Sequence, residues 1–412
     1  MLRGKRQIIV GVDIGNSKVT TLVGEKEEEK INFIGFGKVP LSGLRKGTIV
    51  DIDETITALS LSLEEAERMI GFPIDRAYLS VSGSNVYSLN SKGVIAISRS
   101  GAEITKEDIN RVLEAAKAVS IPPNKEIIHV LPKIFIIDGQ EELKDPIGAK
   151  GVRLEVEAHL ITVSSPVIKT LLKCAYQAGL DVQELVFSPL AASSVLLSKK
   201  QKEIGVLLCD IGAGTTDIAV YEEGSLIHSA VIPLGGIHLT SDIAIGLKIS
   251  LELAEKIKLT WGVATPHMVS ERVQLDLSEL DPSQNIKVPK KYVAEIIEAR
   301  IQEIFSLVRQ ELRKIGRDGL LPAGVVLTGG TSKLPQIEEV AKDSLKLPAQ
   351  LGKVIPVGGV VDKEKLEDPS NAVALGLVFW GKEKLEKESL PLSFLENFSQ
   401  VFSKIKGLFR KS

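Results

Sequence analysis

The chain has 412 residues, which at about 150 residues per domain predicts two or three domains with large cores. Its 51 Lys and Arg residues nearly balance 53 Asp and Glu residues, and the net charge of −2 excludes the strongly positive field of a general nucleic-acid binder. Hydrophobic residues make up 44% and charged residues 25%, which are globular averages and exclude disordered, collagen-like and coiled-coil classes.

The N-terminal stretch and the cysteines predict a chain that stays in a reducing compartment. The residues before Asp13 have a basic flank but too few apolar side chains for a signal-peptide core or a membrane span. Cys174 and Cys209 cannot form a disulfide framework, and both lie in apolar segments that predict small buried thiols.

The first predicted element is a β-hairpin at residues 8–23, IIVGVDIGNSKVTTLV, and its pattern recurs 197 residues later at 205–220, GVLLCDIGAGTTDIAV. Each copy has a β-rich run, Asp-Ile-Gly, a short polar loop and a second β-branched run, which is typical of a hairpin with a tight loop. One such hairpin would be explained as a simple turn. Two copies at matching positions predict a duplicated chain.

The loops of both hairpins carry residue types that suit a metal–polyphosphate. Glycines permit close backbone approach, so that consecutive N–H groups can point at one anion, and hydroxyl groups add donors. The glycine and hydroxyl residues of the two loops are Gly15, Ser17, Gly212, Gly214, Thr215 and Thr216. Asp13 and Asp210 end the first strand of each copy, and carboxylates there suit a hydrated Mg²⁺ ion that keeps its waters.

Residues 84–161, between the two hairpins, predict a small α+β subdomain. In chain order the pattern indicates a strand pair at 85–98, a helix at 105–120 that opens on Thr105, a strand at 125–138, a Pro/Gly turn at 144–151 and a strand at 152–164.

Two further elements follow the second hairpin. In 251–262, LELAEKIKLTWG, Glu255 and Lys258 fall on one helix face, where an ordinary solvated ion pair is the simpler interpretation. In 323–335, AGVVLTGGTSKLP, a β-run ends in Gly329 and Gly330 before a helix-like stretch that opens at Ser332. A backbone of this kind suits close packing against a nucleoside.

The two hairpins, the helix at 251–262 and the segment at 323–335, in this order, resemble the actin-like ATPase superfamily. This superfamily includes actins, sugar kinases, seventy-kilodalton chaperones and bacterial cytoskeletal proteins. No G-x-x-x-x-G-K-[ST] motif occurs, which argues against a P-loop enzyme. The resemblance implies an α/β, duplicated actin-like (ribonuclease H-like) fold of two halves that binds ATP and Mg²⁺ between them. It implies that Asp13 and Asp210 hold the metal through water.

The resemblance also assigns the nucleotide contacts. The implied phosphate-binding residues are Gly15, Asn16, Ser17, Lys18, Gly212, Ala213, Gly214, Thr215 and Thr216. The implied adenosine-binding residues are Glu255, Lys258, Gly329, Gly330 and Ser332.

The insert carries a closer resemblance. The segments SVSGSNV at 80–86, HVLPKIFIID at 129–138 and DPIGAKGVRLEVEAHLITV at 145–163 are similar to the FtsA family of bacterial cell-division proteins, as are 231–244 and 293–312. The family pattern divides the chain into 1–83 plus 162–200 (subdomain 1A), 84–161 (1C), 201–258 plus 317–381 (2A), 259–316 (2B), a linker at 382–391 and an amphipathic helix at 392–412.

The C-terminal stretch predicts a membrane-surface helix. Residues 382–391, KEKLEKESLP, are charged and predict a tether. Beyond them, apolar side chains recur at helical spacing on one face with basic residues around them, a pattern that favours a membrane surface over a core helix. The predicted membrane-contacting residues are Phe394, Leu395, Phe398, Val401, Phe402, Ile405, Leu408, Phe409, Lys404, Lys406, Arg410 and Lys411.

The FtsA resemblance implies an adaptor on the cytoplasmic face of the cell membrane at the division site. Such a protein attaches the FtsZ ring to the membrane, self-associates into actin-like filaments and recruits later division proteins through its insert. The FtsZ C-terminal peptide would dock on 259–316. Arg300 matches a family position implicated there, and Lys290 and Lys291 lie just before the same predicted helix, although solvated basic residues need no partner.

Hydrolysis is expected to be weak or absent. Hydrolysing relatives carry Glu or Gln where this chain has Ser188, and serine is too short and too weakly basic to orient the attacking water. A pilus-assembly protein, a rod-shape cytoskeletal actin and a sugar or acid kinase remain alternatives. The insert segments and the basic C-terminal stretch argue against the first two, and the absence of a sugar-cleft signature argues against the third.

Overall fold

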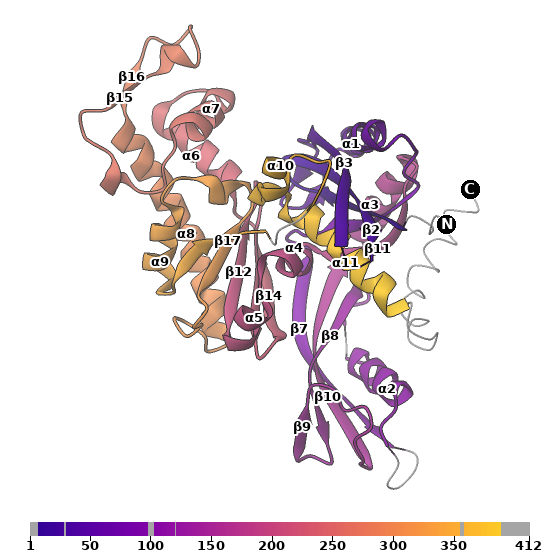
Figure 1. Ribbon diagram of the computed structural model, residues 1–412. Coiled ribbons are helices and arrows are strands. Elements are labelled where there is room, and N and C mark those ends of the chain that lie inside the picture. The colour runs from indigo at the N-terminus through magenta and orange to yellow at the C-terminus, as the bar shows by residue number, and fades with distance from the viewer. Residues whose placement is uncertain (1–6, 29, 98–102, 120, 355–357, 389–412) are drawn as a thin grey trace.

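The computed structural model describes residues 7–28, 30–97, 103–119, 121–354 and 358–388. Two α/β halves lie side by side, and a third, smaller sheet projects from the first half (Figure 1). The predicted membrane-contacting residues at 392–412 lie outside the described residues. Cys174 and Cys209 are buried and unpaired, as predicted.

The first half is built on a six-stranded sheet in the order β11-β6-β1-β2-β3-β19. Its strands are β1 (Gln7–Ile14), β2 (Lys18–Glu27), β3 (Lys30–Pro40), β6 (Arg76–Val81), β11 (Asp181–Phe187) and β19 (Gly358–Gly359). The first three run antiparallel, whereas β6 and β11 are parallel to β1. Its helices are α1 (Ile52–Ile70), α3 (Ser165–Gln177), α4 (Ser188–Leu196) and α11 (Ala372–Glu388).

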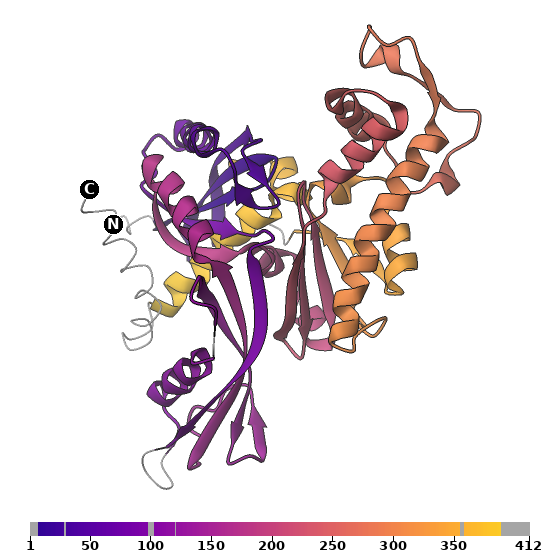
Figure 2. The same ribbon diagram turned by 180° about the vertical axis from the view of Figure 1, so that it is seen from behind.

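The second half repeats this topology, which confirms the predicted duplication. Its sheet has the order β14-β13-β12-β17-β18, which matches β3-β2-β1-β6-β11 strand for strand. The strands are β12 (Val206–Ile211), β13 (Thr216–Glu222), β14 (Ser225–Ile232), β17 (Val325–Thr328) and β18 (Ala349–Leu351). The helices are α6 (Gly236–Leu247), α7 (Leu251–Trp261), α8 (Lys290–Lys314) and α9 (Ile337–Leu345), and α6 and α7 pack together above the sheet (Figure 2).

The insert forms its own sheet in the order β7-β10-β8-β9, with α2 on one face. Its elements are β7 (Val86–Ala96), α2 (Lys106–Lys117), β8 (Lys125–Ile137), β9 (Glu141–Leu143) and β10 (Arg153–Ser164). Thr105 caps α2 as predicted, through a hydrogen bond from Asp108 N. The predicted strand pair at 85–98 is wrong, because β7 is one strand paired with β10. Gly93 allows α2 to cross it, since a Cβ there would lie 2.2 Å from Val112 O.

Shorter elements complete the chain. They are β4 (Leu44–Arg45), β5 (Thr48–Ile49), α5 (Lys199–Ile204), β15 (Gln274–Asp276), β16 (Lys287–Pro289), α10 (Lys363–Glu367) and four 3₁₀ helices, Pro266–Met268, Leu277–Glu279, Gly330–Lys333 and Pro369–Asn371.

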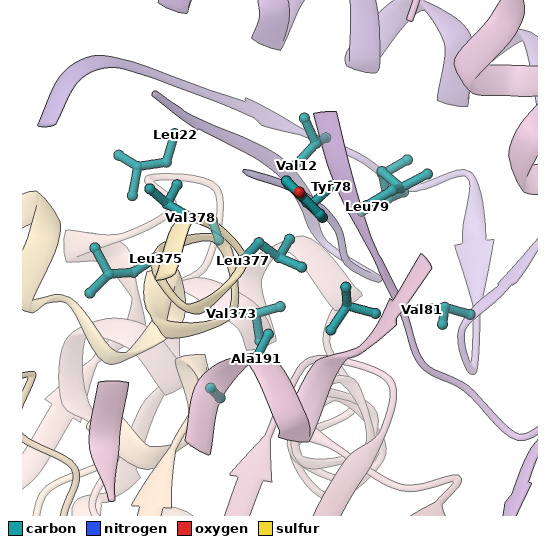
Figure 3. Close-up of a cluster of buried hydrophobic side chains, with 14 of the residues drawn as sticks. Val12, Leu22, Tyr78, Leu79, Val81, Ala191, Val373, Leu375, Leu377 and Val378 are labelled. Atoms are coloured by element: carbon teal, nitrogen blue, oxygen red, sulfur yellow. The ribbon is translucent and has the colours of Figure 1, made fainter. Parts of the chain in front are cut away.

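Helix α11 packs between the first sheet and α4 (Figure 3). Figure 3 shows Leu377 and Val378 beside Leu22 and Tyr78 of the sheet, and all four side chains are buried. Glycines permit the close approach on both sides, because a Cβ would lie 2.6 Å from Ala374 O at Gly11 and 1.9 Å from Ala191 O at Gly376.

The predicted charged tether at 382–391 is wrong for its first seven residues, because α11 continues to Glu388. The charges there have partners on the body of the first half. Lys384 pairs with Glu184 at 3.0 Å, and Lys26 pairs with Glu386 at 3.7 Å. A charged segment can therefore be the polar face of a docked helix, which composition alone does not distinguish from a tether.

Candidate functional site

A cleft of about 440 Å³ lies between the two halves, within the usual size range of small-molecule sites. It gathers residues that lie far apart in the sequence and come from both hairpins. The predicted site residues that line it are Asp13, Gly15, Asn16, Ser17, Lys18, Ser188, Asp210, Gly212, Ala213, Thr215, Glu255, Lys258, Gly329 and Gly330. Gly214, Thr216 and Ser332 are not among its lining residues.

The two hairpin turns have the same backbone geometry. Gly15 N donates to Lys18 O, and Gly212 N donates to Thr215 O, each across 2.9 Å. The repeat in sequence therefore produces the same local fold twice. Both turns present their loop residues to one cleft, as a clamp on a polyphosphate requires.

Gly214 and Thr216 support the turns from behind the cleft surface. A Cβ at Gly214 would lie 2.6 Å from Asn16 Cγ, so the glycine lets the two turns meet. Thr216 is fully buried, and its Oγ1 donates to Leu234 O across 2.9 Å. Neither residue lines the cleft, so a direct contact of either with phosphate stays a prediction.

Three carboxylates lie at the meeting of the halves: Asp210 and Asp217 are buried, and Asp13 is partly buried. Asp13 Oδ1 accepts a hydrogen bond of 2.7 Å from Ser80. Burial raises the pKa of Asp13, and burial with the charges of Asp217 and Asp13 raises the pKa of Asp210 well above its ordinary value. A cation between them would relieve this cost, so the donor set fits a hydrated Mg²⁺ ion. Among the described residues, no group of three His, Cys, Asp or Glu side chains is arranged to hold an ion directly.

The prediction missed Asp217, the third carboxylate. It pairs with Asp210 across β12 and β13, at the position that Thr20 occupies opposite Asp13 in the first copy. Burial raises the pKa of Asp217 to about 7, although hydrogen bonds from Ser82 and Thr215 oppose the rise. The signal that could have found it is this difference between the two copies of the repeat.

Lys18 is a partly buried cation of the cleft. Its Nζ donates to Ser370 Oγ and to Asn371 Oδ1, each at 2.7 Å. Burial and the neighbouring Lys38 lower the pKa of Lys18 to about 7. A polyphosphate beside this ammonium would favour its charged form.

Glu255 and Lys258 lie on α7 and form the predicted ion pair, with 2.6 Å between Nζ and Oε2. The pair is more than a solvated contact, because Lys258 Nζ also donates to Thr240 Oγ1 at 2.8 Å and to Gly236 O at 3.1 Å. Thr240 in turn donates to Glu255. The network joins α7 to the start of α6 at the cleft wall.

The Gly329 segment forms a tight corner over the carboxylates. Gly329 has φ +86°, and a Cβ there would lie 2.3 Å from Asp210 Oδ1, so only glycine fits without strain. The predicted helix at Ser332 is wrong: Gly330–Lys333 is a 3₁₀ turn, and α9 begins only at Ile337. Ser332 is fully buried and donates to Gly329 O at 2.7 Å, so it fixes the corner instead of facing the cleft.

The sequence prediction missed several other residues of the cleft wall. They are Ile14, Lys38, Gly47, Ser82, Gly236, Leu259, Gly262, Thr331, Lys333, Leu334, Pro335, Pro369, Ser370 and Val373. Leu259, Leu334 and Pro335 contribute apolar surface to the cleft, which suits a planar base. Half of the missed positions lie within the motif segments 8–23, 251–262 and 323–335, where the prediction assigned contacts to their neighbours only. The other half come from outside these three segments, and only the folded chain brings them to the cleft.

Ser188 begins α4 and lies in the cleft wall, only 5% exposed. Phe187, just before it, donates its backbone N–H to Nε2 of His129 at 3.0 Å. His129 belongs to β8 of the insert, and burial, helped by the charge of Lys384, lowers its pKa to about 3. The neutral ring therefore accepts this bond and fixes the strand end that places Ser188.

Two of the residues predicted to bind a partner, Arg300 and Lys291, form ion pairs within the second half. Arg300 donates to both carboxylate oxygens of Asp242 on α6, at 2.6 and 2.9 Å, and also contacts Glu303. Lys291 pairs with Glu271 at 2.8 Å. Lys290 and Lys291 are the first residues of α8, and the prediction that they precede it is wrong. In the part of the chain that the structure describes, no helix is long and apolar enough to cross a membrane.

Known structures place the architecture in the actin-like class. A chain of the PilM-PilN type IV pilus biogenesis complex aligns with a TM-score of 0.66 at 18% identity, over 90% of this chain and 98% of that one. MreB5 of Spiroplasma citri bound to AMPPNP aligns with a TM-score of 0.57 at 14% identity, over 94% of this chain and all of that one. The fold is therefore actin-like, with a small α+β insert.

Sequence relatives define the family more closely. Residues 207–376 match the family described as Cell division protein FtsA, and residues 83–162 match the SHS2 domain inserted in FTSA. Cell division protein FtsA of Bacillus subtilis is 41% identical over 90% of this chain and 83% of its own length. The protein of that name from Borreliella burgdorferi is 38% identical over 98% of this chain and 99% of its own length. The chain belongs to the FtsA family of cell-division proteins.

Proposed function

We propose that the chain is an ATP-binding, actin-like adaptor that assembles and tethers the FtsZ division ring to the cytoplasmic membrane. The observation that carries the nucleotide part is the pair of matching turns, Gly15–Lys18 and Gly212–Thr215, which contribute residues to one cleft with Asp13 and Asp210. The solved structures of MreB5 bound to ADP and to AMPPNP, which share the fold, support the same ligand class.

In this proposal Mg²⁺ supplies charge neutralisation to the phosphates when it is bound. Asp13 and Asp210 would hold its waters, the two turns would offer backbone N–H groups to the phosphates, and Glu255 and Lys258 would contact the ribose. Isothermal titration of the full chain with Mg-ATP tests the site. Asp210→Ala should abolish binding without unfolding the protein, whereas unchanged affinity in that variant would refute the metal assignment.

ATP acts here as a ligand that holds the two halves together. Ser188 offers no carboxylate to orient water, so turnover is expected to be slow or absent. The third alternative, a sugar or acid kinase, is tested by incubation with labelled ATP and candidate sugars. Transfer of label to any small hydroxyl compound would replace the adaptor proposal.

The proposed FtsZ contact lies on the surface formed by α8 and its neighbours within 259–316. A short acidic, hydrophobic peptide would meet Lys290 and Lys291 there, close to the start of α8. Arg300 is a poorer probe than its position suggests, because Arg300→Glu would set a third carboxylate beside Asp242 and Glu303 and repel them. The informative variant is therefore the double substitution of Lys290 and Lys291 by Glu, because Glu271, which pairs with Lys291, is largely exposed and tolerates a like charge better than the partners of Arg300.

Co-pelleting with FtsZ polymers is the measurement for this contact. The double variant should lose FtsZ at low salt, and a matched substitution of Lys199 and Lys200 on α5 by Glu should retain it. If both variants lose FtsZ binding equally, or if neither loses it, the docking surface lies elsewhere.

The proposed membrane contact is the amphipathic segment at 392–412. Insertion of its apolar face, together with basic residues near anionic lipid, is enough for reversible binding, with each basic residue contributing about 1 kcal/mol. Phe402→Glu should leave the protein in the supernatant with anionic liposomes that pellet the wild type. Replacement of Lys404 and Lys406 by Gln should weaken binding without abolishing it. Sedimentation of Phe402→Glu at physiological salt would contradict the membrane role.

Self-association into filaments, contact of the insert with a neighbouring protomer and with later division proteins, and location at the division site complete the proposal. Membership of the FtsA family supports each of these roles. Deletion of 84–161 is too disruptive a test, because His129 of the insert holds the strand before Ser188. Substitution of the exposed Val94 and Val152 by Asp is a milder test of insert contacts, read out as polymer length.

A further inference from the structure

A short turn between α10 and α11 contacts the cleft from the C-terminal part of the chain. It comprises Asp368, Pro369, Ser370 and Asn371, of which Pro369–Asn371 form a 3₁₀ helix. We call these four residues the Asp368 turn. Nothing in the repeated hairpins or in the motifs of the sequence points to it.

The Asp368 turn holds the ammonium of Lys18. Lys18 Nζ donates to Ser370 Oγ and Asn371 Oδ1, both at 2.7 Å, and Asn371 is only 2% exposed. A lysine ammonium has three N–H donors, so two of them are committed to the turn. The third lies near the Lys38 side chain, which offers no acceptor while it is charged, so this donor has no protein acceptor there. Since Lys18 lines the cleft, the remaining donor is available to a ligand there.

The same turn joins cations from both halves. Asp368 Oδ2 lies 3.6 Å from Lys38 Nζ of the first half and 3.3 Å from Lys333 Nζ of the second. Its Oδ1 accepts from Ser370 N at 2.9 Å. Although burial opposes ionisation, these hydrogen bonds and the two lysines lower the pKa of Asp368 to about 2. The carboxylate is therefore a permanent anion among the cleft lysines.

The backbone of the turn is anchored in the second half and leads straight into α11. Pro369 O accepts from Thr328 Oγ1 at 3.0 Å and from Gly329 N at 3.3 Å, at the corner that covers Asp210. Asn371 Nδ2 donates to Lys365 O at 2.8 Å. Helix α11 begins at Ala372, the next residue, and lies against β1, the strand that ends in the first turn of the cleft.

Building on the proposed ATP site, we propose that Ser370 and Asn371 are positioning residues that hold the Lys18 ammonium in place for the polyphosphate. In the same proposal, polyphosphate binding in the cleft reduces the mobility of the Asp368 turn and, through it, of helix α11. A phosphate oxygen that takes the third donor of Lys18 completes the coordination of a group already bound to the turn. The Asp368 turn then becomes less mobile, and so does the first helical turn of α11. The arrangement makes α11 responsive to phosphate and not to the base.

A double-mutant cycle on the full chain tests the positioning role. Ser370→Ala should weaken Mg-ATP and inorganic tripolyphosphate about three- to tenfold and leave adenosine unchanged. Lys18→Met should weaken both phosphates more strongly, and Ser370→Ala added to it should cause little further loss. Ser370→Thr, which keeps the hydroxyl, should bind like the wild type. Thermal unfolding of each variant excludes general damage to the fold.

The outcomes separate the inference from the function on which it rests. If the wild type does not bind Mg-ATP, the proposed site itself fails. If the wild type binds but the effects of Ser370→Ala and Lys18→Met simply add, or if adenosine is weakened equally, the positioning role is refuted while the ATP site stands. Asn371→Ala is a second probe, because it removes the other acceptor of Lys18. It should weaken Mg-ATP and tripolyphosphate but not adenosine, and wild-type phosphate binding by the folded variant would refute the role of Asn371.

Hydrogen exchange tests the transmission step. Mg-ATP should slow exchange in a peptide that covers the first two turns of α11, and adenosine should not. The slowing should disappear in Ser370→Ala at a nucleotide concentration that saturates it. Equal slowing in the variant, or no slowing in the wild type, would refute the link between the cleft and α11.

Discussion

Ser82 of the first half and Asp217 of the second half are joined by a hydrogen bond of 2.5 Å between the Ser82 hydroxyl and Oδ1 of the carboxyl group. The bond crosses between the halves at the cleft wall, where both residues are found. The two halves therefore touch at the carboxylate cluster through this bond. A bound cation would therefore act on a contact between the halves as well as on the phosphates.

Asp217→Asn should stabilise the ligand-free protein at neutral and alkaline pH. Burial raises the pKa of Asp217 to about 7, so its favourable contribution is complete below about 4, the ordinary value, and is lost as pH rises through 7. Because an asparagine side chain does not ionise, the variant does not lose stability in this way. In urea unfolding its advantage over the wild type should be larger at pH 8 than at pH 5 by an amount on the order of 2 kcal/mol.

The same variant should bind Mg-ATP more weakly, because it removes a charge that faces the metal site. Ser82→Ala is the matched control, since it removes the bond but keeps the carboxylate. A pH-independent advantage of Asp217→Asn would contradict the buried-carboxylate interpretation.

Gly329→Ala should damage both fold and site. The residue has φ +86° and its new Cβ would meet Asp210 Oδ1 at 2.3 Å, so the expected cost is about 1–3 kcal/mol of unfolding free energy, with Mg-ATP affinity lowered at least tenfold. Gly330→Ala is the control for stability, because its Cβ would find only Ser370 Cβ at 3.9 Å. Equal melting temperatures for the two variants would show that the corner at Gly329 is not strained.

Ser188→Glu should raise ATP turnover. The residue begins α4 in the cleft wall, and a carboxylate at the N-terminus of a helix is electrostatically favourable. If a missing acceptor limits hydrolysis, phosphate release should increase at least severalfold in single-turnover assays, while Ser188→Ala stays at the wild-type rate. An unchanged rate in a folded, ATP-binding Ser188→Glu protein would mean that water access or closure is limiting.

Mild acid should destabilise the insert contact at His129. Burial lowers its pKa to about 3 from an ordinary 6.5, so below about 6.5 the unfolded chain takes up a proton that the folded chain excludes. Stability should therefore fall by up to about 1.4 kcal/mol per pH unit between 6.5 and 3 from this group. His129→Gln should reduce the acid slope of unfolding by nearly one proton. A slope identical to the wild type would show that His129 is not the titrating group.

The sequence predicted those parts of the site that are local in the chain. Each hairpin turn is encoded within a few residues, and its backbone bonds depend on glycine and on short strands, so Gly15 and Gly212 could be assigned directly. The prediction missed Asp217 because it rests on the residues that the two copies share. At the position of Asp217 the two copies differ, since the first copy has Thr20 there. Ser332 was misassigned because a buried hydroxyl that caps its own turn has the same sequence pattern as one that faces a ligand.

The long-range parts of the architecture could not be predicted in this way. The contacts of Ser370 with Lys18 and of His129 with Phe187 span 352 and 58 residues, and they depend on how sheets and helices pack. The end of α11 was mistaken for a tether because its charges resemble those of a solvated linker, and only Glu184 and Lys26 on the body reveal them as docked.

The packing of α11 also determines how the protein responds to mechanical force. Because Gly11 and Gly376 let the helix lie in direct backbone contact with a strand on one side and with α4 on the other, it cannot slide without breaking many contacts together. Tension applied to the chain beyond Glu388 would therefore load the core of the first half in shear, and only secondarily its surface. A molecule pulled from that end in an optical trap should resist until the first half yields as one cooperative unit.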